Sequence, residues 1–195
     1  RAVLLFIEFI LYLLMNYCDN ISMTHLYHSV PKELVGNILY PLNELKTIYP
    51  EIYAKERSKY IGREEVTQQI IPKLDCLWND VLHFSAVHPS IIKSALAEAG
   101  DQVNLKRTYY EVDASLLDLE KTVSYLYLYN DKNKQENWAA YDPRDLDKYS
   151  LIPLFTKDYY KKMLERNERP LLYHGIPHIL YRGTLDTTKL RIVSP

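Results

Sequence analysis

Short segments, most of them ended by proline or glycine, make up the chain from residue 23 onward. Residues 25–30 (HLYHSV) alternate between apolar and polar side chains and stop at Pro31, which is typical of a short strand. Residues 89–99 begin with a proline and stop at Gly100, the usual signals for the two ends of a helix. Segments this short bury an apolar face only by packing on one another, so the pattern predicts a core shared by helices and strands.

Further strands are predicted in the centre and at the end of the chain, at 81–87, 107–113, 121–129 and 179–182. In the third of these, aromatic and aliphatic residues occupy both faces of the strand, so we expect both faces to be covered.

Further helices are predicted on either side of these strands. Residues 32–39 suggest a brief helix, and 42–60 suggest two helices or one broken at Pro50. A short helix over 62–71 and a later one, capped by Thr156 and running to about 168, complete the set. The sequence therefore predicts an α+β fold: a single domain with a central, mostly antiparallel sheet and with helices concentrated in the N-terminal half.

The balance of charge limits the classes of partner. The 195 residues carry 24 basic and 25 acidic side chains, a formal charge of −1. Binding nucleic acid through bulk electrostatics needs a clustered basic footprint, so we do not expect it here, although a local basic groove stays possible. Two cysteines, Cys18 and Cys76, form neither a metal-ligand spacing nor a disulfide framework. Their scarcity predicts a reducing, cytoplasmic location.

The first 22 residues, RAVLLFIEFILYLLMNYCDNIS, differ from the rest of the chain. Their apolar run is shorter than the roughly 20 residues that a membrane-spanning helix needs, and no small-residue cleavage pattern follows it. Met15 and Met23 are both possible translation starts. We interpret residues 1–22 as upstream or fragmentary sequence outside the fold, which leaves 23–195 as the domain and predicts no stable membrane insertion. A membrane-associated helix is the competing interpretation.

Several common chemistries have no motif in this chain. The sequence has no glycine-rich phosphate loop, no dinucleotide fingerprint, no HExxH or paired CxxC, and no GxSxG elbow. With only five glycines, a loop that wraps phosphates with its backbone is not expected. A nucleotide would have to be held by side chains, and no metal is predicted.

A particular order of segments nevertheless suggests a family. LYHSV is followed by a segment with the spacing xxLxxIL, then by an arginine in KYIGREE, then by WNDVLHFSAVHPSII, and finally by PHILYRGTLDTTKLRIV. This order, over roughly residues 24–193, resembles the ADP-ribosyltransferase-like fold, in particular the DarT family of DNA-modifying toxins and more distantly the RNA 2′-phosphotransferases. The matching feature is the order of elements rather than a signature motif.

The resemblance implies NAD as a co-substrate and a macromolecule, protein or nucleic acid, as the acceptor. It implies that His28 contacts NAD, that Arg63 neutralises the pyrophosphate, and that Tyr60 and Phe84 flank the nicotinamide. Where the family's last strand presents a catalytic glutamate, this chain has His178. Glu111, in YYEVD, is the other candidate for a group beside the reacting ribose. The implied cleft lies between the first strand, the Arg63 segment and the 81–87 strand.

Other interpretations of the same residues stay open. Arg63 lies in a charged stretch that is typical of a solvated helix face with local ion pairs, so only the resemblance supports a role for it. His28 could be a hydrogen-bonded structural histidine. Asp80, His83 and Ser85 could form a hydrolase triad, but no strained turn exposes the serine, so we do not favour it. The alternative to an enzyme is a non-catalytic binding or interaction domain of the same fold, whose function is uncharacterised.

Overall fold

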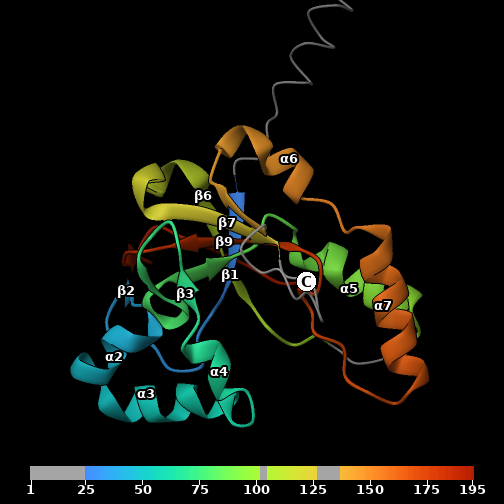
Figure 1. The fold of residues 1–195 in the computed structure, drawn as a ribbon, viewed down its shortest axis with the longest axis horizontal. Coiled ribbons are helices and arrows are strands. Elements are labelled where there is room, and N and C mark those ends of the chain that lie inside the picture. Colours follow the sequence, from blue (N-terminus) through green and yellow to red (C-terminus); the bar gives the residue numbers. More distant parts are fainter. Residues whose placement is uncertain (1–24, 102–104, 127–136) are drawn as a thin grey trace, which may run out of the picture.

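The computed structural model describes residues 25–101, 105–126 and 137–195, and it shows strands surrounded by helices (Figure 1). All strand pairings between these residues are antiparallel, which confirms the α+β class. The segment 1–22 and the end of the strand expected at 121–129 lie outside the described residues. No helix in the described ranges is long and apolar enough to cross a membrane.

The expected central sheet consists of two larger sheets with two small strand pairs beside them. The first sheet has the order β1 (His25–Ser29), β6 (Tyr109–Asp113), β11 (Arg191–Val193). The second has the order β5 (Leu82–Phe84), β9 (Pro177–Tyr181), β7 (Thr122–Leu126), β8 (Trp138–Ala140). The small pairs are β2 (Ile38–Leu39) with β10 (Leu185–Asp186), and β3 (Ile70–Ile71) with β4 (Cys76–Leu77).

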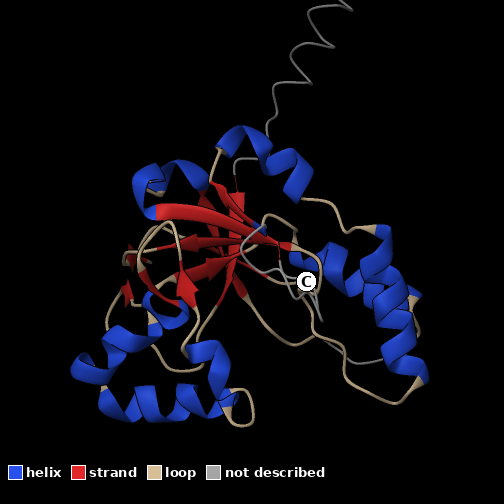
Figure 2. Ribbon diagram, viewed as in Figure 1, coloured by secondary structure: helices blue, strands red, loops and turns tan. Residues whose placement is uncertain are grey.

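The helices form two groups around the strands (Figure 2). One group, next to β2 and β3, contains α2 (Leu42–Ile48), α3 (Pro50–Arg57), the 3₁₀ turn η1 (Ser58–Tyr60) and α4 (Glu64–Thr67). The other pairs α5 (Pro89–Glu98) with α7 (Leu154–Glu165), and α6 (Leu146–Tyr149) lies apart from both. The remaining 3₁₀ turns are η2 (Trp78–Asp80), η3 (Ala114–Leu116), η4 (Leu119–Lys121) and η6 (Pro143–Asp145).

Proline and glycine set several of these boundaries as the sequence predicts. Pro50 begins α3 directly after α2 ends. Pro89 begins α5, whose first turn is capped by the ring of His88, and Gly100 follows the helix with φ +98°. A proline has no N–H to lose in a first turn, and a glycine adopts positive φ without a steric cost.

The structure differs from the sequence prediction in three places. Residues 32–39 are not a helix, because the chain turns at Gly36 (φ +71°) and then pairs as β2 with β10. The helix expected over 62–71 is only the single turn α4, followed by β3. Thr156 is inside α7 rather than at its cap, and its Oγ1 donates a hydrogen bond to the carbonyl of His174.

The two larger sheets meet at one point. Tyr27 of β1 and Ser85, directly after β5, exchange two main-chain hydrogen bonds of 2.8 and 3.1 Å. On either side of this bridge the strands diverge, since neither sheet pairs β1 with β5 elsewhere. Buried residues from both sheets, including Leu26, Phe84 and Ile179, form a shared core beneath the bridge. The bridge therefore joins two sheets whose edges separate next to it.

Candidate functional site

The gap between β1 and β5 opens directly after the Tyr27–Ser85 bridge. In a regular antiparallel ladder the next main-chain bond would join Ser29 to His83. Instead, Nδ1 of His28 lies 2.7 Å from the carbonyl oxygen of His83. A side chain thus takes the place of a ladder bond, and β1 is free to separate from β5 at this point.

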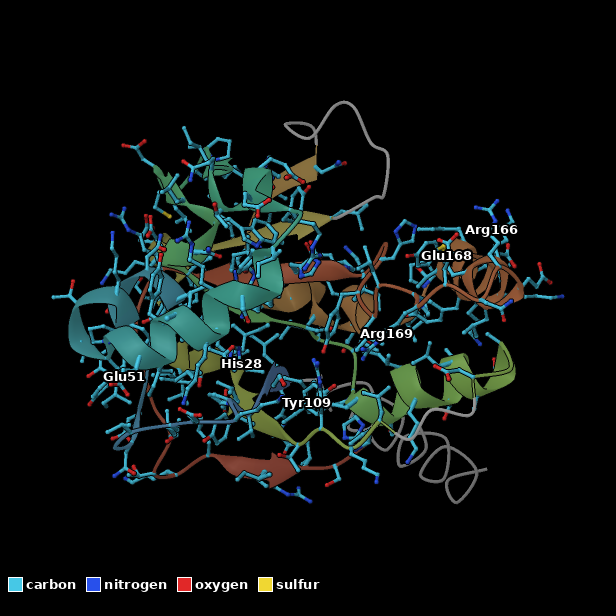
Figure 3. All side chains as sticks on the ribbon, turned by 90° about the horizontal axis from the view of Figure 1, so that it is seen from below. His28, Glu51, Tyr109, Arg166, Glu168 and Arg169 are labelled. Atoms are coloured by element: carbon cyan, nitrogen blue, oxygen red, sulfur yellow. The ribbon has the colours of Figure 1, made fainter. Side chains whose placement is uncertain are left out.

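This hydrogen bond fixes the tautomer of His28. A carbonyl oxygen can only accept, so Nδ1 carries the proton and Nε2 keeps a lone pair. Burial lowers the pKa of His28 to about 4, against the opposing effect of the bond to His83, and the charge of Lys59 lowers it further. His28 is therefore neutral near pH 7 and presents an acceptor nitrogen. In Figure 3 its ring lies between β1 and the helices of the α2–α3 group.

Two further histidines lie on one face of the second sheet. His83 pairs with Leu180 on β9, and His178 lies two residues earlier on the same strand, so both rings project from the same face. Nε2 of His83 donates to the carbonyl of Trp78, 3.0 Å away, and the Trp78 ring packs against both histidines. Burial lowers the pKa of His83 to about 3, with a contribution from His178, and that of His178 to about 4.

A cavity of about 110 Å³ occupies the gap beside His28 and His83. Its apolar walls come from the segment after β1, from α2 and α3, and from the start of β5: Leu34, Leu39, Leu45, Ile52, Val81 and Leu82. Tyr40, Tyr49 and Tyr60 add aromatic surface. Such a volume holds a single ring, whereas sites for drug-sized ligands measure roughly 300–1,000 Å³.

Charged groups line the end of the cavity formed by α3 and η1. Lys59 and Glu56 both contribute to its wall, with Nζ and Oε2 3.5 Å apart. Arg63 is exposed, and its guanidinium donates to the main-chain carbonyl of Lys59, 2.9 Å away. Arg63 therefore lies at the rim rather than inside. Glu33 also lines the cavity and is paired with Lys55 at 2.7 Å.

The structure brings together some of the residues that the sequence suggested. His28 and Tyr60 line the cavity. Burial raises the pKa of Tyr60, whose side chain also has a hydrogen bond to Trp78. Phe84 is 1% exposed and does not line the cavity, but its ring packs against that of His28, with the ring centroids 5.4 Å apart. His178 packs against Trp78 and does not line the cavity.

Glu111 lies away from these residues. It pairs with Tyr27 across β1 and β6, so it shares the face of Tyr27, whereas His28 projects from the opposite face. Its carboxylate accepts a hydrogen bond from the Tyr27 hydroxyl at 3.5 Å and lies 3.4 Å from Arg191 on β11. The structure thus gives Glu111 an ion pair on the face of the first sheet opposite His28.

The residues of the disfavoured hydrolase triad are engaged separately. Oγ of Ser85 accepts from the N–H of Val87, and Asp80 accepts from the N–H of Leu77. His83 donates to Trp78, as described above. None of these bonds joins two members of the triad, so it is not assembled here. Among the described residues there is also no group of three or more His, Cys, Asp or Glu side chains placed to hold a metal ion.

Asn79 is a cavity residue that the sequence reasoning missed. It lies in η2, is 3% exposed, and its Oδ1 has no hydrogen-bond partner within the described part of the chain. Most buried polar atoms are hydrogen-bonded, which makes this one unusual. The signal in the sequence was a polar pair, Asn79 and Asp80, within the otherwise apolar run CLWNDVL.

Comparison of this chain with protein-family models, with curated proteins and with solved structures found no match.

Proposed function

We propose that this protein binds NAD at the gap between β1 and β5, as an ADP-ribosyltransferase-like protein. The observation that carries the proposal is the position of the cavity: it adjoins β1 through His28, η1 through Tyr60 and β5 through His83. These are the three segments from which the family resemblance draws its NAD cleft.

The size and polarity of the cavity support one orientation of the dinucleotide. About 110 Å³ holds the nicotinamide ring but not the rest of the molecule. The ring would pack on Tyr60 and the apolar wall, and the two phosphates would lie at the rim. Lys59 and Arg63, joined there by a hydrogen bond, supply positive charge for them.

Transfer of ADP-ribose also requires a group that stabilises the charge developing on the ribose. The bond between ribose C1′ and nicotinamide N1 breaks, nicotinamide leaves with that electron pair, the acceptor bonds to C1′, and the acceptor's proton passes to a base. A carboxylate stabilises the positive charge that develops on the ribose. His178 is neutral, and Glu111 lies on the face of its sheet opposite His28. The cavity is lined by two carboxylates, Glu33 and Glu56. We assign the role to Glu56, because its ion pair with Lys59 (3.5 Å) is longer than that of Glu33 with Lys55 (2.7 Å).

The second candidate function is binding without transfer. The neutral ring of His178, where the family presents a glutamate, favours it. Glu56 is also within 3.5 Å of Lys59, which diminishes its negative charge toward a ligand. The two candidates share the NAD site and differ only in whether label from NAD reaches an acceptor.

Titration calorimetry with NAD on the 195-residue protein tests the binding. Arg63→Ala should weaken the affinity at least tenfold, because it removes a cation from the rim. Arg57→Ala is the matched control, since Arg57 is an exposed arginine of the same charged stretch, whereas Arg63 is the one bonded to the carbonyl of Lys59 at the rim. No heat of binding with the unchanged protein, or equal losses in both variants, contradicts the proposal.

Incubation with labelled NAD and mixed protein, DNA and RNA acceptors separates the two candidates. Incorporation that Glu56→Gln abolishes, with NAD affinity retained, identifies a transferase. Binding of NAD with no incorporation into any acceptor identifies a non-catalytic binding domain.

A further inference from the structure

Asn79 occupies a position where a hydrogen-bonding side chain is costly. It is 3% exposed in the wall of the cavity, and its Oδ1 has no partner among the described residues. A buried acceptor left unpaired costs about 1–3 kcal/mol relative to a paired one. Leucine, of similar size, would avoid that cost, so the amide requires an explanation other than packing.

The surroundings of Asn79 hold its main chain in place and leave the amide uncommitted. The next residue, Asp80, accepts hydrogen bonds from the N–H of Leu77 and from Nδ2 of Asn43, both at 2.7 Å. These bonds anchor η2 to β4 and α2. The backbone of Asn79 is thereby fixed in the cavity wall, and the bonds that fix it do not use its Oδ1.

We propose that the Asn79 amide is a ligand-recognition group, which pairs with a planar edge that presents an N–H donor beside an acceptor. An asparagine amide offers one acceptor and two donors in a plane, and it forms two parallel hydrogen bonds with such an edge. A ring-bound carboxamide and an aminopurine both carry this edge. The inference rests on the proposed function only in that the same cavity is the ligand site.

The rest of the wall fits this class of ligand. Its aliphatic and tyrosine side chains pack on the faces of a ring, and the volume limits the ligand to about one ring system. Nε2 of His28 adds a second acceptor in the same wall, since Nδ1–H is committed to His83. Two acceptors and a largely apolar wall select a neutral ligand with N–H donors over an anionic one.

The test compares the unchanged protein with Asn79→Leu and Asn79→Asp by calorimetry and by thermal unfolding. The probes are nicotinamide, its acid analogue nicotinate, and adenosine. The unchanged protein should bind nicotinamide or adenosine, according to which edge fits, and should bind nicotinate at least tenfold more weakly than nicotinamide. Both variants should lose at least tenfold in affinity for the probe that binds.

Thermal unfolding without ligand distinguishes recognition from structural support. Asn79→Leu should unfold at the same or a higher temperature, because it removes an unpaired buried acceptor. A lower unfolding temperature, or unchanged affinity in Asn79→Leu, overturns the inference. Binding of NAD with equal affinity by Asn79→Leu overturns it alone and leaves the proposed function standing. Binding of nicotinamide or adenosine without binding of NAD contradicts only the proposed function.

Discussion

The ring of His28 donates its Nδ1–H to the main-chain carbonyl of His83, across the point where β1 and β5 separate. The bond replaces the one that Ser29 would supply in a regular ladder, so it satisfies a carbonyl that the gap would otherwise leave unpaired. One side chain therefore both permits the gap and lines the cavity within it.

Replacing His28 by phenylalanine tests this relationship. His28→Phe keeps a ring beside Phe84 but removes the N–H that donates to the His83 carbonyl, so we expect a loss of about 1–3 kcal/mol in the free energy of unfolding. His28→Asn, whose Nδ2 lies near the place of Nδ1, should recover part of that loss. Urea denaturation measures both. The exposed His25 provides the control, because His25→Phe should change the value by less than about 0.5 kcal/mol.

Equal destabilisation of His28→Phe and His28→Asn would show that ring packing, rather than the hydrogen bond, holds β1 against β5. That outcome would also weaken the assignment of Nε2 as a free acceptor.

Acid should destabilise the protein before its carboxylates titrate. The pKa values of His28 and His178 are lowered to about 4, and that of His83 to about 3, whereas the ordinary value is 6.5. Above pH 6.5 neither the folded nor the unfolded chain protonates them, and the stabilisation is complete. As the pH falls from 6.5 toward 4, the unfolded chain takes up protons that the folded chain does not, so stability is lost.

Between pH 6.5 and 4, each of the three histidine rings lowers the free energy of unfolding by up to about 1.4 kcal/mol per pH unit as the pH falls. His178→Phe removes one titrating ring from beside Trp78, so its free energy of unfolding should fall less steeply with pH. Urea midpoints at pH 7.5, 6.5, 5.5 and 5.0 give both slopes, with the carboxylates common to the two proteins. Parallel curves for the two proteins would mean that His178 protonates in the folded state at its ordinary pKa.

Local signals in the sequence identify several elements correctly. The break at Pro50 and the helix between Pro89 and Gly100 depend on a missing N–H and on positive φ, both of which are properties of a single residue. The alternation in 25–30 and in 107–113 likewise identifies β1 and β6, because a strand's period of two is local.

The candidate site depends on contacts that no local pattern carries. β1 and β5 meet through residues 58 positions apart, Tyr27 and Ser85, and their separation beyond that bridge leaves no mark on either segment. The same limit explains why the helix predicted over residues 32–39 is wrong. The pairing of β2 with β10, which is a tertiary contact, overrides a weak helical spacing. Asn79 lies in the cavity wall only because η2 packs against α2, which is likewise a tertiary contact.

Thr156 supports α7 through a buried bond rather than through a cap. Its side chain is 0% exposed, and Oγ1 donates to the carbonyl of His174 at 2.9 Å. Thr156→Val keeps the shape and removes this buried hydrogen bond, so we expect a loss of about 1–3 kcal/mol by chemical denaturation. Thr67→Val is the matched control, because Thr67 also bonds a carbonyl, that of Glu64, at the surface. At the surface, water can replace the bond that Thr67→Val removes, so this variant should lose less stability than Thr156→Val. A similar loss in both variants would show that burial of the Thr156 bond is not the cause.

The turn before β9 requires a glycine for two reasons at once. Gly175 has φ +68°, and a Cβ at this position would lie against the ring of Phe155 and 2.8 Å from Oγ1 of Thr156. The Phe155 ring is 46% exposed and can move outward, but Thr156 is held by its bond to His174. Gly62 has a similar φ of +77°, and a Cβ added there would meet no atom within 4 Å, so Gly62→Ala isolates the backbone effect.

Gly62→Ala should therefore lose about 1–2 kcal/mol, the cost of a side chain in the left-handed region. Gly175→Ala should lose more than that, because the new methyl group also displaces Thr156 from its hydrogen bond. Combining Gly175→Ala with Thr156→Val in a double-mutant cycle measures the coupling, since two residues that share this contact should not give additive losses. Additive losses, or equal losses in the two glycine variants, would show that the backbone conformation alone selects glycine before β9.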